Sequence, residues 1–574
     1  MNSDNTRCEA LVLILLAAWA CSSAVAEEQA IHLSPVAQVY LDAGATMVAA
    51  GPRGEVYALG IDKEVGGPNF ERTFVRRSID FGRTFEPARF FTDGGASEFS
   101  HRVVTDSRGG VYVSWNRLQP PPDAAGLFCN CSHDAGATWL ESDVKVSVDD
   151  ARGVGSHRLT FAERDLVHVV WIDSGPDQPR HGIWHRRSLD GGITFEPKVT
   201  PLWFEEYYSD LVYVRAVCAD GDGSVYALLS RETPGDPDDN ELYVQTSLDD
   251  GVTWLGPVLV DPISESLGCA ALQCDADGNV FVAWCGNRNG FGDVFFTCSQ
   301  DQGRTFEATR RLNADDPPGQ FPGSGKVTLA GDEEGNLYAA WQRGNDVRVN
   351  VSRDRGATWA GDVSLGPTVA WDLPKLVANE AGHVAVTWVA RTTGEFAIEL
   401  NVSRDFGTTW LPTPLRIDDP NGLAYRQELV MDPAGRVYVA WEEEFPEGMG
   451  LRAEATFRAA YPTLGISLVP VDDADGLIIV PPGGERIAVD VDLVNHHPTA
   501  PLPGLTAYLE GGLPDGRIIG PLGDPKTFGI PLGGARGATL RKRFPGNKPP
   551  GLYYLIVTTE GAIEDSVRLP IIKR

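Results

Sequence analysis

One eight-residue turn recurs seven times along the chain, and this repetition limits the possible folds more than any other feature. The copy "SRDRGATW" occupies residues 352–359. The other six copies begin at Ser78, Ser132, Ser188, Ser247, Ser299 and Ser403. Serine, aspartate, glycine and a final Trp or Phe keep the same spacing in every copy. Because a motif that recurs at a regular period marks recurring structural units, we expect a repeat architecture.

A second motif recurs with the turn: a hairpin of the type Asp-x-x-Gly, followed by an alternating strand that ends in Trp in most copies. "DSRGGVYVSW" from Asp106 and "DADGNVFVAW" from Asp275 are two clear examples. The eight strands that follow these hairpins start at Val56, Val111, Val167, Val225, Val280, Leu337, Val384 and Val437. Successive starts are 47 to 58 residues apart. A period near fifty residues favours repeated supersecondary units over a chain of unrelated domains.

Each repeat is expected to contain four short strands. In the second repeat these strands are "HRVVTD", "VYVSW", "LFCNCS" and one that begins near "TWLESDVKVS". Hairpins join consecutive strands, so each repeat is predicted to be an antiparallel meander. Such a sheet cannot bury both faces alone, and radial packing around an axis solves this in a β-propeller. Eight copies predict eight four-stranded blades; seven follow if the weak copy at Gly51 or at Asp220 forms no blade.

The eighth repeat, from Gln427 to about residue 459, has three strands and no Ser-x-Asp turn that leads to a fourth. The segment "QAIHLSPVAQV", residues 29–39, resembles the strand that follows the turn elsewhere. We therefore predict that this N-terminal segment supplies the missing fourth strand. It would close the ring and cover an open sheet edge that could otherwise recruit other chains.

The seven turns match the Asp-box, or BNR repeat, S-x-D-x-G-x-T-[WF], and the chain resembles sialidase-like β-propellers from about residue 30 to residue 459. The resemblance implies that the boxes join the third and fourth strands, on the face away from the usual active site. It implies a structural role for the box aspartates, which can accept hydrogen bonds from N–H groups of the turn. These aspartates are Asp80, Asp134, Asp190, Asp249, Asp301, Asp354 and Asp405.

Three segments are predicted from composition and pattern. Residues 1–26 contain an apolar run followed by an A-x-A site, which is typical of a cleaved signal peptide. We therefore expect a secreted, periplasmic or cell-surface protein, with Cys21 as a lipid-anchored alternative. Residues 27–462 form the propeller. Residues 463–574 lack the repeat, and their alternating pattern predicts a small immunoglobulin-like β-sandwich.

The formal net charge of −30 argues against nucleic acid and anionic membranes as partners, because like charges repel. After the signal, no segment is apolar for long enough to cross a membrane. The mature chain keeps seven cysteines, and a local disulfide is plausible among Cys269, Cys274, Cys285 and Cys298. Without a CxxC pair or an accompanying histidine, we predict no metal site and no cofactor.

Ligands of propellers usually bind around the central channel, on the face opposite the boxes. Cationic residues recur at the start of the predicted innermost strands: Arg102, Arg158, Arg215, Lys375 and Arg426, with Lys326 nearby. Together they could bind a carboxylate, sulfate or phosphate group. The alternative is that they pair with Glu98, Asp210, Asp372 or Glu428 and hold the blades together.

The connection "LWFEEYYSDLVY" from Leu202 gathers Trp203, Tyr207 and Tyr208 beside two glutamates. Aromatic rings next to carboxylates suit sugar stacking combined with acid or base chemistry. The same residues also suit the packing of a long loop, which is the slightly favoured interpretation.

The resemblance leaves the activity open. Enzymes of the sialidase family share six blades, an arginine triad, a Tyr/Glu nucleophile pair, an acidic Asp and an early F/Y-R-I-P motif. This chain has no R-I-P near its start, so no catalytic residue is carried over. We predict an exported propeller that binds a glycan or another anionic ligand at the channel mouth. The alternatives are a glycoside hydrolase that holds its substrate anion with Arg102, Arg158 and Arg215, and a non-catalytic scaffold or adhesin with a cell-surface partner.

Overall fold

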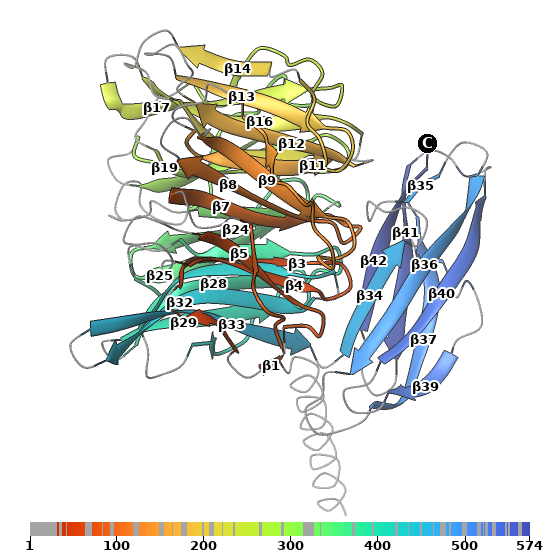
Figure 1. Ribbon diagram of the computed structural model, residues 1–574. Helices are drawn as coiled ribbons and strands as arrows, with labels where there is room; N and C mark the ends of the chain where they lie inside the picture. Colours follow the sequence, from red (N-terminus) through yellow and green to blue (C-terminus); the bar gives the residue numbers. More distant parts are fainter. Residues whose placement is uncertain are drawn as a thin grey trace, which may run out of the picture.

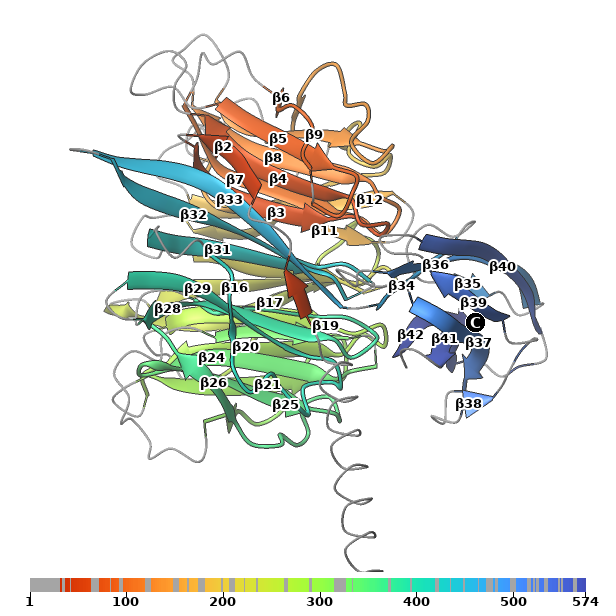
Figure 2. The ribbon, with the colours of Figure 1, turned by 90° about the horizontal axis from the view of Figure 1, so that it is seen from below.

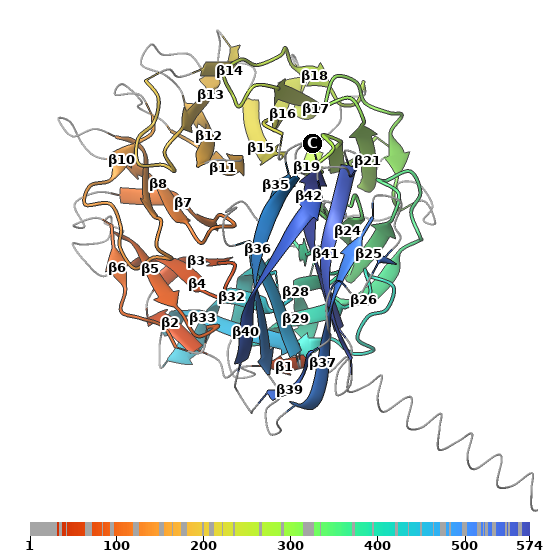
Figure 3. The same ribbon diagram turned by 90° about the vertical axis from the view of Figure 1, so that its right-hand side faces the viewer.

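The computed structural model describes residues 31–573 except for connecting segments, the longest of which are 63–71, 174–180, 314–326 and 471–477. The described residues form strands β1 to β42 and no helix. Most of these strands belong to eight sheets arranged in a ring (Figures 1 and 3). The predicted all-β propeller is therefore confirmed.

Seven sheets are four-stranded antiparallel meanders in chain order. Blades 1 and 2 comprise β3 (Ala43–Ala50), β4 (Val56–Asp62), β5 (Arg72–Ser78), β6 (Arg89–Phe90), β7 (Ser97–Thr105), β8 (Val111–Leu118), β9 (Gly126–Ser132) and β10 (Val144–Lys145). Blades 3 and 4 comprise β11 (His157–Ala162), β12 (Leu166–Asp173), β13 (His181–Ser188), β14 (Thr200–Glu205), β15 (Val212–Ala219), β16 (Val225–Thr233), β17 (Asp236–Ser247) and β18 (Val258–Leu259).

Blades 5 to 7 repeat the pattern. They comprise β19 (Leu267–Cys274), β20 (Val280–Gly286), β21 (Asp293–Ser299), β22 (Arg310–Arg311), β23 (Val327–Gly331), β24 (Leu337–Arg343), β25 (Asp346–Ser352), β26 (Val363–Pro367), β27 (Lys375–Ala378), β28 (Val384–Thr392), β29 (Glu395–Ser403) and β30 (Leu415–Arg416). The first strand of each blade lies nearest the centre of the ring and the short fourth strand lies at the rim (Figure 3).

The eighth sheet closes the ring with strands from both ends of the propeller. It contains β31 (Leu423–Met431), β32 (Val437–Glu447) and β33 (Gly450–Pro462). Both β1 (Ile31–Leu33) and β2 (Ala37–Leu41) pair antiparallel with β33, with Leu33 opposite Ala460 and Ala37 opposite Phe457. The predicted N-terminal closing strand is confirmed. The structure thus has seven four-stranded blades and a five-stranded eighth blade, in which the N-terminal strands β1 and β2 cover the outer edge of β33.

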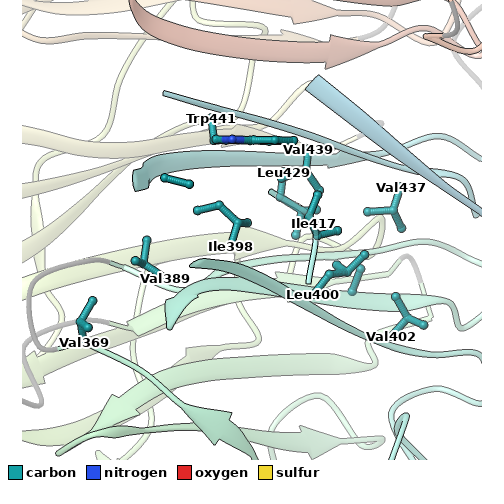
Figure 4. Packing of buried hydrophobic residues seen from close by; sticks show 12 residues of the cluster. Val369, Val389, Ile398, Leu400, Val402, Ile417, Leu429, Val437, Val439 and Trp441 are labelled. Carbon is teal, nitrogen blue, oxygen red and sulfur yellow. The ribbon is translucent and has the colours of Figure 1, made fainter. Parts of the chain in front are cut away.

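Contact between neighbouring blades buries both faces of each sheet. Between blades 7 and 8, Ile398 and Leu400 of β29 pack with Val439 and Trp441 of β32 (Figure 4). The tryptophans of the second strands occupy equivalent buried positions in six blades. These residues are Trp115, Trp171, Trp284, Trp341, Trp388 and Trp441. Each large ring fills a gap between two sheets, which explains why the strand motif ends in Trp.

All seven Ser-x-Asp turns have the same hydrogen bonds. The serine Oγ donates to the aspartate Oδ1 at 2.7–2.9 Å and accepts from the glycine N–H at 2.7–2.9 Å. The threonine donates its N–H to Oδ1 at 2.7–2.9 Å and its hydroxyl to Oδ2 at 2.6–2.7 Å. Burial alone would raise the pKa of Asp134, but hydrogen bonds from Thr138 and Ser132 lower it to about 2.

The turn also docks on the hairpin of its own blade, which explains why the two motifs occur together. The N–H of Phe406 donates to the Gly382 carbonyl at 2.8 Å, and Asp250 makes the equivalent bond to Gly223 at 2.8 Å. The turn glycine has positive φ, which glycine adopts readily: φ is 78° at Gly82 and 81° at Gly356. The preceding residue also has positive φ, even where it is bulky: φ is 63° at Phe81 and 58° at Arg355. Two consecutive positive φ values aim the N–H group at the hairpin.

The chain leaves the ring at Pro462 and forms two further sheets. One sheet contains β34 (Leu464–Pro470), β36 (Gly484–Asn495) and β40 (Ala535–Pro545). The other contains β35 (Ile478–Val480), β37 (Leu502–Gly512), β38 (Ile518–Ile519), β39 (Lys526–Ile530), β41 (Gly551–Glu560) and β42 (Asp565–Lys573). Two sheets agree with the predicted sandwich, but β35 and β42 pair in parallel, and the immunoglobulin-like topology stays a prediction.

The C-terminal sheets lie on the side of the ring where the third strands end, which is the side of the Ser-x-Asp turns (Figures 1 and 2). This follows from connectivity, because β34 begins two residues after β33 ends. The opposite face, where the fourth strand of one blade connects to the first strand of the next, lies away from these sheets.

Replacing Asp190 by Ala should lower the free energy of unfolding by about 1–3 kcal/mol, because the turn around it loses the acceptor of three hydrogen bonds. Leu189 is the matched control, since its side chain is 52% exposed in the same turn. Leu189→Ser should change stability by less than about 0.5 kcal/mol. Urea unfolding followed by tryptophan fluorescence measures both. Equal urea midpoints for the two variants would contradict a structural role of the turn.

Candidate functional site

Strand register places several predicted cations at one level of the central channel. Arg102 lies opposite Ser114 and Arg158 opposite Val170, and each of these two residues directly precedes the buried tryptophan of its second strand. In blades 7 and 8 the equivalent positions hold Lys375 and Glu428. In blade 4 this position is Ala216, and Arg215 precedes it within a bulge. Five charged side chains therefore come from equivalent or adjacent positions of five inner strands.

The inner strands are irregular at this level. Register shifts occur between Phe99 and Arg102, between Val214 and Ala216, and between Tyr425 and Glu428. Two non-glycine residues within these bulges, Ser100 and Arg426, both have φ of 54°. Bulges of this kind redirect side chains and concentrate near functional sites. The sequence does not predict these bulges, because neither serine nor arginine favours positive φ.

Arg158 lies between the other two arginines and is held by neutral acceptors. Its Nε donates to the carbonyl of Arg215 at 3.2 Å. Its Nη1 donates to Ser156 Oγ at 3.0 Å and to the carbonyl of His157 at 2.8 Å. These bonds fix the guanidinium without neutralising its charge.

The other two arginines also contact neutral groups. Arg215 donates from Nε to Ser230 Oγ at 2.7 Å, and its guanidinium lies 5.3 Å from the ring centre of Tyr213. Arg102 donates from Nη1 to Met47 Sδ at 3.7 Å. Within the described part of the chain, none of the three arginines has a carboxylate within ion-pairing distance.

Several donors of these arginines remain available to a ligand. Among the described residues, Nε and Nη2 of Arg102, Nη2 of Arg158 and both Nη atoms of Arg215 have no protein acceptor, and none of these nitrogens is among the fully buried ones. They therefore reach solvent. Donors from three consecutive blades converge on one part of the channel, which is an arrangement that can bind an anion.

Burial and mutual repulsion weaken the charged form of these side chains. Burial, and then the charges of Arg102 and Arg215, lower the pKa of Arg158 to about 10. Burial lowers the pKa of Arg102, although the negative charge of Glu428 opposes this. Burial likewise lowers the pKa of Arg215. All three stay protonated at neutral pH, so the channel holds three adjacent positive charges.

Two buried histidines lie beside the arginines. His157 Nε2 lies 2.8 Å from Ser114 Oγ, and the side chain of His101 is also buried. Burial, followed by the charge of Arg102, lowers the pKa of His101 to about 3. The same two causes hold the pKa of His157 far below its ordinary value. Both rings are therefore neutral and add no charge to the site.

The remaining two predicted cations have carboxylate partners, and one of these partners, Glu428, is among those that the alternative interpretation of the sequence names. Lys375 Nζ lies 2.8 Å from Glu428 Oε1, across the interface between blades 7 and 8. Arg426 Nη1 lies 3.0 Å from Glu442 Oε2 within blade 8. The structure thus separates Arg102, Arg158 and Arg215 from the two paired cations.

The predicted aromatic loop contributes little to this site. Trp203 packs with Tyr243 at a centroid distance of 4.9 Å and lies near the guanidinium of Arg231. It therefore belongs to the interface between blades 3 and 4, which agrees with the packing alternative. Tyr207, Tyr208 and Lys326 lie outside the described residues.

Sequence reasoning missed a tyrosine–glutamate pair next to Arg215. The hydroxyl of Tyr213 donates to Glu232 Oε1 at 3.2 Å. Burial, followed by the charge of Glu232, raises the pKa of Tyr213, which keeps the phenol protonated. The two residues come from neighbouring strands of blade 4, and no sequence spacing signals their contact.

The described residues contain no group of three or more metal-ligating side chains and no helix long and apolar enough to cross a membrane. None of the seven cysteines among the described residues forms a disulfide bond. Cys269 and Cys285 come close, with their Sγ atoms 4.0 Å apart, but this exceeds the roughly 2.05 Å of a disulfide bond. The local disulfide considered from the sequence is therefore not formed.

Comparison with known proteins finds only distant structural similarity. No family model and no curated protein matches the chain. Among solved structures, a Hadza microbial sialidase is 14% identical, with a TM-score of 0.34 over 60% of this chain and 63% of that one. An α-L-arabinanase from Penicillium chrysogenum is 13% identical, with a TM-score of 0.37 over 56% and 96% of the two chains.

A third similar structure is the polysaccharide lyase Uly1, which is 10% identical with a TM-score of 0.40 over 74% of this chain and 99% of that one. Similarity this distant carries no argument about activity, so the function has to be argued from the site itself.

The neutral state of His157 predicts a specific pH dependence. Below pH 6.5 the unfolded chain protonates this histidine while the folded protein does not, so its contribution to stability falls as the pH falls. Between pH 7.5 and pH 5, the wild type should lose about 2 kcal/mol relative to His157→Gln. The measurement is the difference between the urea midpoints of the two proteins at each pH. Other groups, such as Asp332 with a pKa raised to about 6, titrate in both proteins, so their effect cancels in this difference. A difference that does not change with pH would contradict a neutral buried His157.

Proposed function

We propose that this protein is an exported β-propeller that binds an anionic group of a glycan in its central channel, with Arg102, Arg158 and Arg215 as the binding residues. Export is part of the proposal, because the signal-like segment 1–26 lies outside the described residues. The resemblance of the turns to those of sialidase-like propellers favours a glycan as the carrier of the anion.

The observation that carries the proposal is that these three arginines have no carboxylate partner within the described part of a chain with 79 acidic residues. A scaffold would gain stability by pairing them, as Lys375 pairs with Glu428 at the same level. Placing three like charges together in a partly buried site instead costs free energy. An anionic ligand would offset that cost, since guanidinium groups bind carboxylate, sulfate and phosphate groups well.

Replacing both Arg102 and Arg158 by Gln should weaken binding to acidic glycans on an array at least about 100-fold, because two charge-assisted contacts are lost. The free energy of unfolding should stay the same or rise, since like-charge repulsion is relieved. Arg53→Gln is the charge-matched control, because Arg53 is exposed on the opposite face. Unchanged binding by the double variant, or equal loss in the control, would show that the channel is not the binding site.

A second function is favoured by one observation, the Tyr213–Glu232 contact beside Arg215. In a glycoside hydrolase, Glu232 could accept the phenol proton as Tyr213 attacks the anomeric carbon of a sugar whose anion is held by the arginines. The raised pKa of Tyr213 opposes this, and a carboxylic acid for the leaving group is still unassigned.

Tyr213→Phe and Glu232→Gln separate hydrolysis from binding. If the protein is a hydrolase, it should cleave at least one fluorogenic sialoside or uronide, and each variant should lower kcat at least about 100-fold while leaving binding on the array largely intact. If the wild type cleaves none of these glycosides, the binding function stands alone.

A further inference from the structure

We infer that the anionic group bound by Arg102, Arg158 and Arg215 carries two negative charges and three terminal oxygens, as the phosphate monoester of a phosphorylated sugar does. The inference rests on the proposed function, because it names the chemistry of the ligand for that same site. It starts from the charge of the site and from the positions of its free donors.

The charge of the site is nearly threefold positive. Among the described residues, Glu428 is the carboxylate whose charge acts on Arg102, and it is already bound to Lys375 at 2.8 Å. His101 and His157 are neutral and neither add nor remove charge. A carboxylate would neutralise one of the three arginines and leave two adjacent cations uncompensated. A phosphate monoester with two charges relieves most of the remaining repulsion.

The positions of the donors point to the same chemistry. The free nitrogens belong to three side chains on the inner strands of three consecutive blades, so a ligand between these blades can accept from three separate side chains. A planar carboxylate offers two oxygens, which lie in one plane. A phosphate monoester offers three strong acceptor oxygens around a tetrahedral centre, one for each guanidinium. A sulfate ester has the same shape but carries only one charge.

This difference can be measured with three sugars that vary in charge and shape. The probes are glucose 6-phosphate, glucose 6-sulfate and glucuronate, and isothermal titration calorimetry at pH 7.5 and low salt measures each Kd. Glucose 6-phosphate should bind at least about tenfold more tightly than either other probe, because only it has two charges. Glucose 6-sulfate separates the effect of charge from that of shape.

Lowering the pH provides an internal control, because the phosphate group has a second pKa near 6 and is largely singly charged at pH 5. The site keeps its charge over this range, since both histidines stay neutral. The advantage of glucose 6-phosphate over glucose 6-sulfate should therefore fall to about threefold or less at pH 5. Binding of the other two probes should change little.

Arg215→Gln tests the charge count directly, because it removes one positive charge and should reduce the preference for glucose 6-phosphate, whereas Arg53→Gln should leave it unchanged. If glucuronate or glucose 6-sulfate binds as tightly as glucose 6-phosphate at pH 7.5, the inference of a doubly charged ligand is wrong while the anion site stands. If none of the three probes binds, and no acidic glycan binds on the array, the proposed function itself fails.

Discussion

A sheet with two apolar faces is stable in water only when both faces are covered, and every other feature of this protein depends on that constraint. Each blade is covered by its two neighbours, so no blade can be removed without exposing two others. The ring must also close. Strands β1 and β2 close the ring by pairing with β33, although more than 400 residues separate these two strands from β33 in the chain. The pairing removes the free edge that a row of eight sheets would present.

The two recurring motifs stabilise one face of this ring. The polar groups of the Ser-x-Asp turn bond to one another. One N–H group of the turn also donates to the hairpin of the same blade, as Phe406 does to Gly382. The C-terminal sheets lie on this same side (Figures 1 and 2). The inner-strand bulges belong instead to the channel, as do the three arginines that have no carboxylate partner among the described residues. Fold and proposed function are therefore carried by different residues, and a change in one set can leave the other intact.

Much of this fold could be predicted from the sequence, because each blade repeats the same local signals. The period and the role of Asp80 and its equivalents follow from residues close together in the chain, and the closing strand follows from comparison of the incomplete eighth repeat with the other repeats. The candidate site follows only in part. Lys375 and Glu428 are 53 residues apart, and Tyr213 and Glu232 are 19 apart, so their contacts depend on register and on bulges at residues such as Ser100 that do not favour positive φ.

The overall negative charge of the chain affects how an anionic ligand reaches Arg102, Arg158 and Arg215. A net charge of −30 repels an anionic ligand at long range, while the three arginines attract it only within a Debye length of about 10 Å at 0.1 M salt. Salt therefore acts in two opposed ways: it screens the repulsion that slows approach, and it weakens the attraction in the channel. A partly buried site is screened less than the surface. Moderate salt should thus speed association more than it shortens the life of the complex, which is the behaviour of an anion site recessed within an acidic protein.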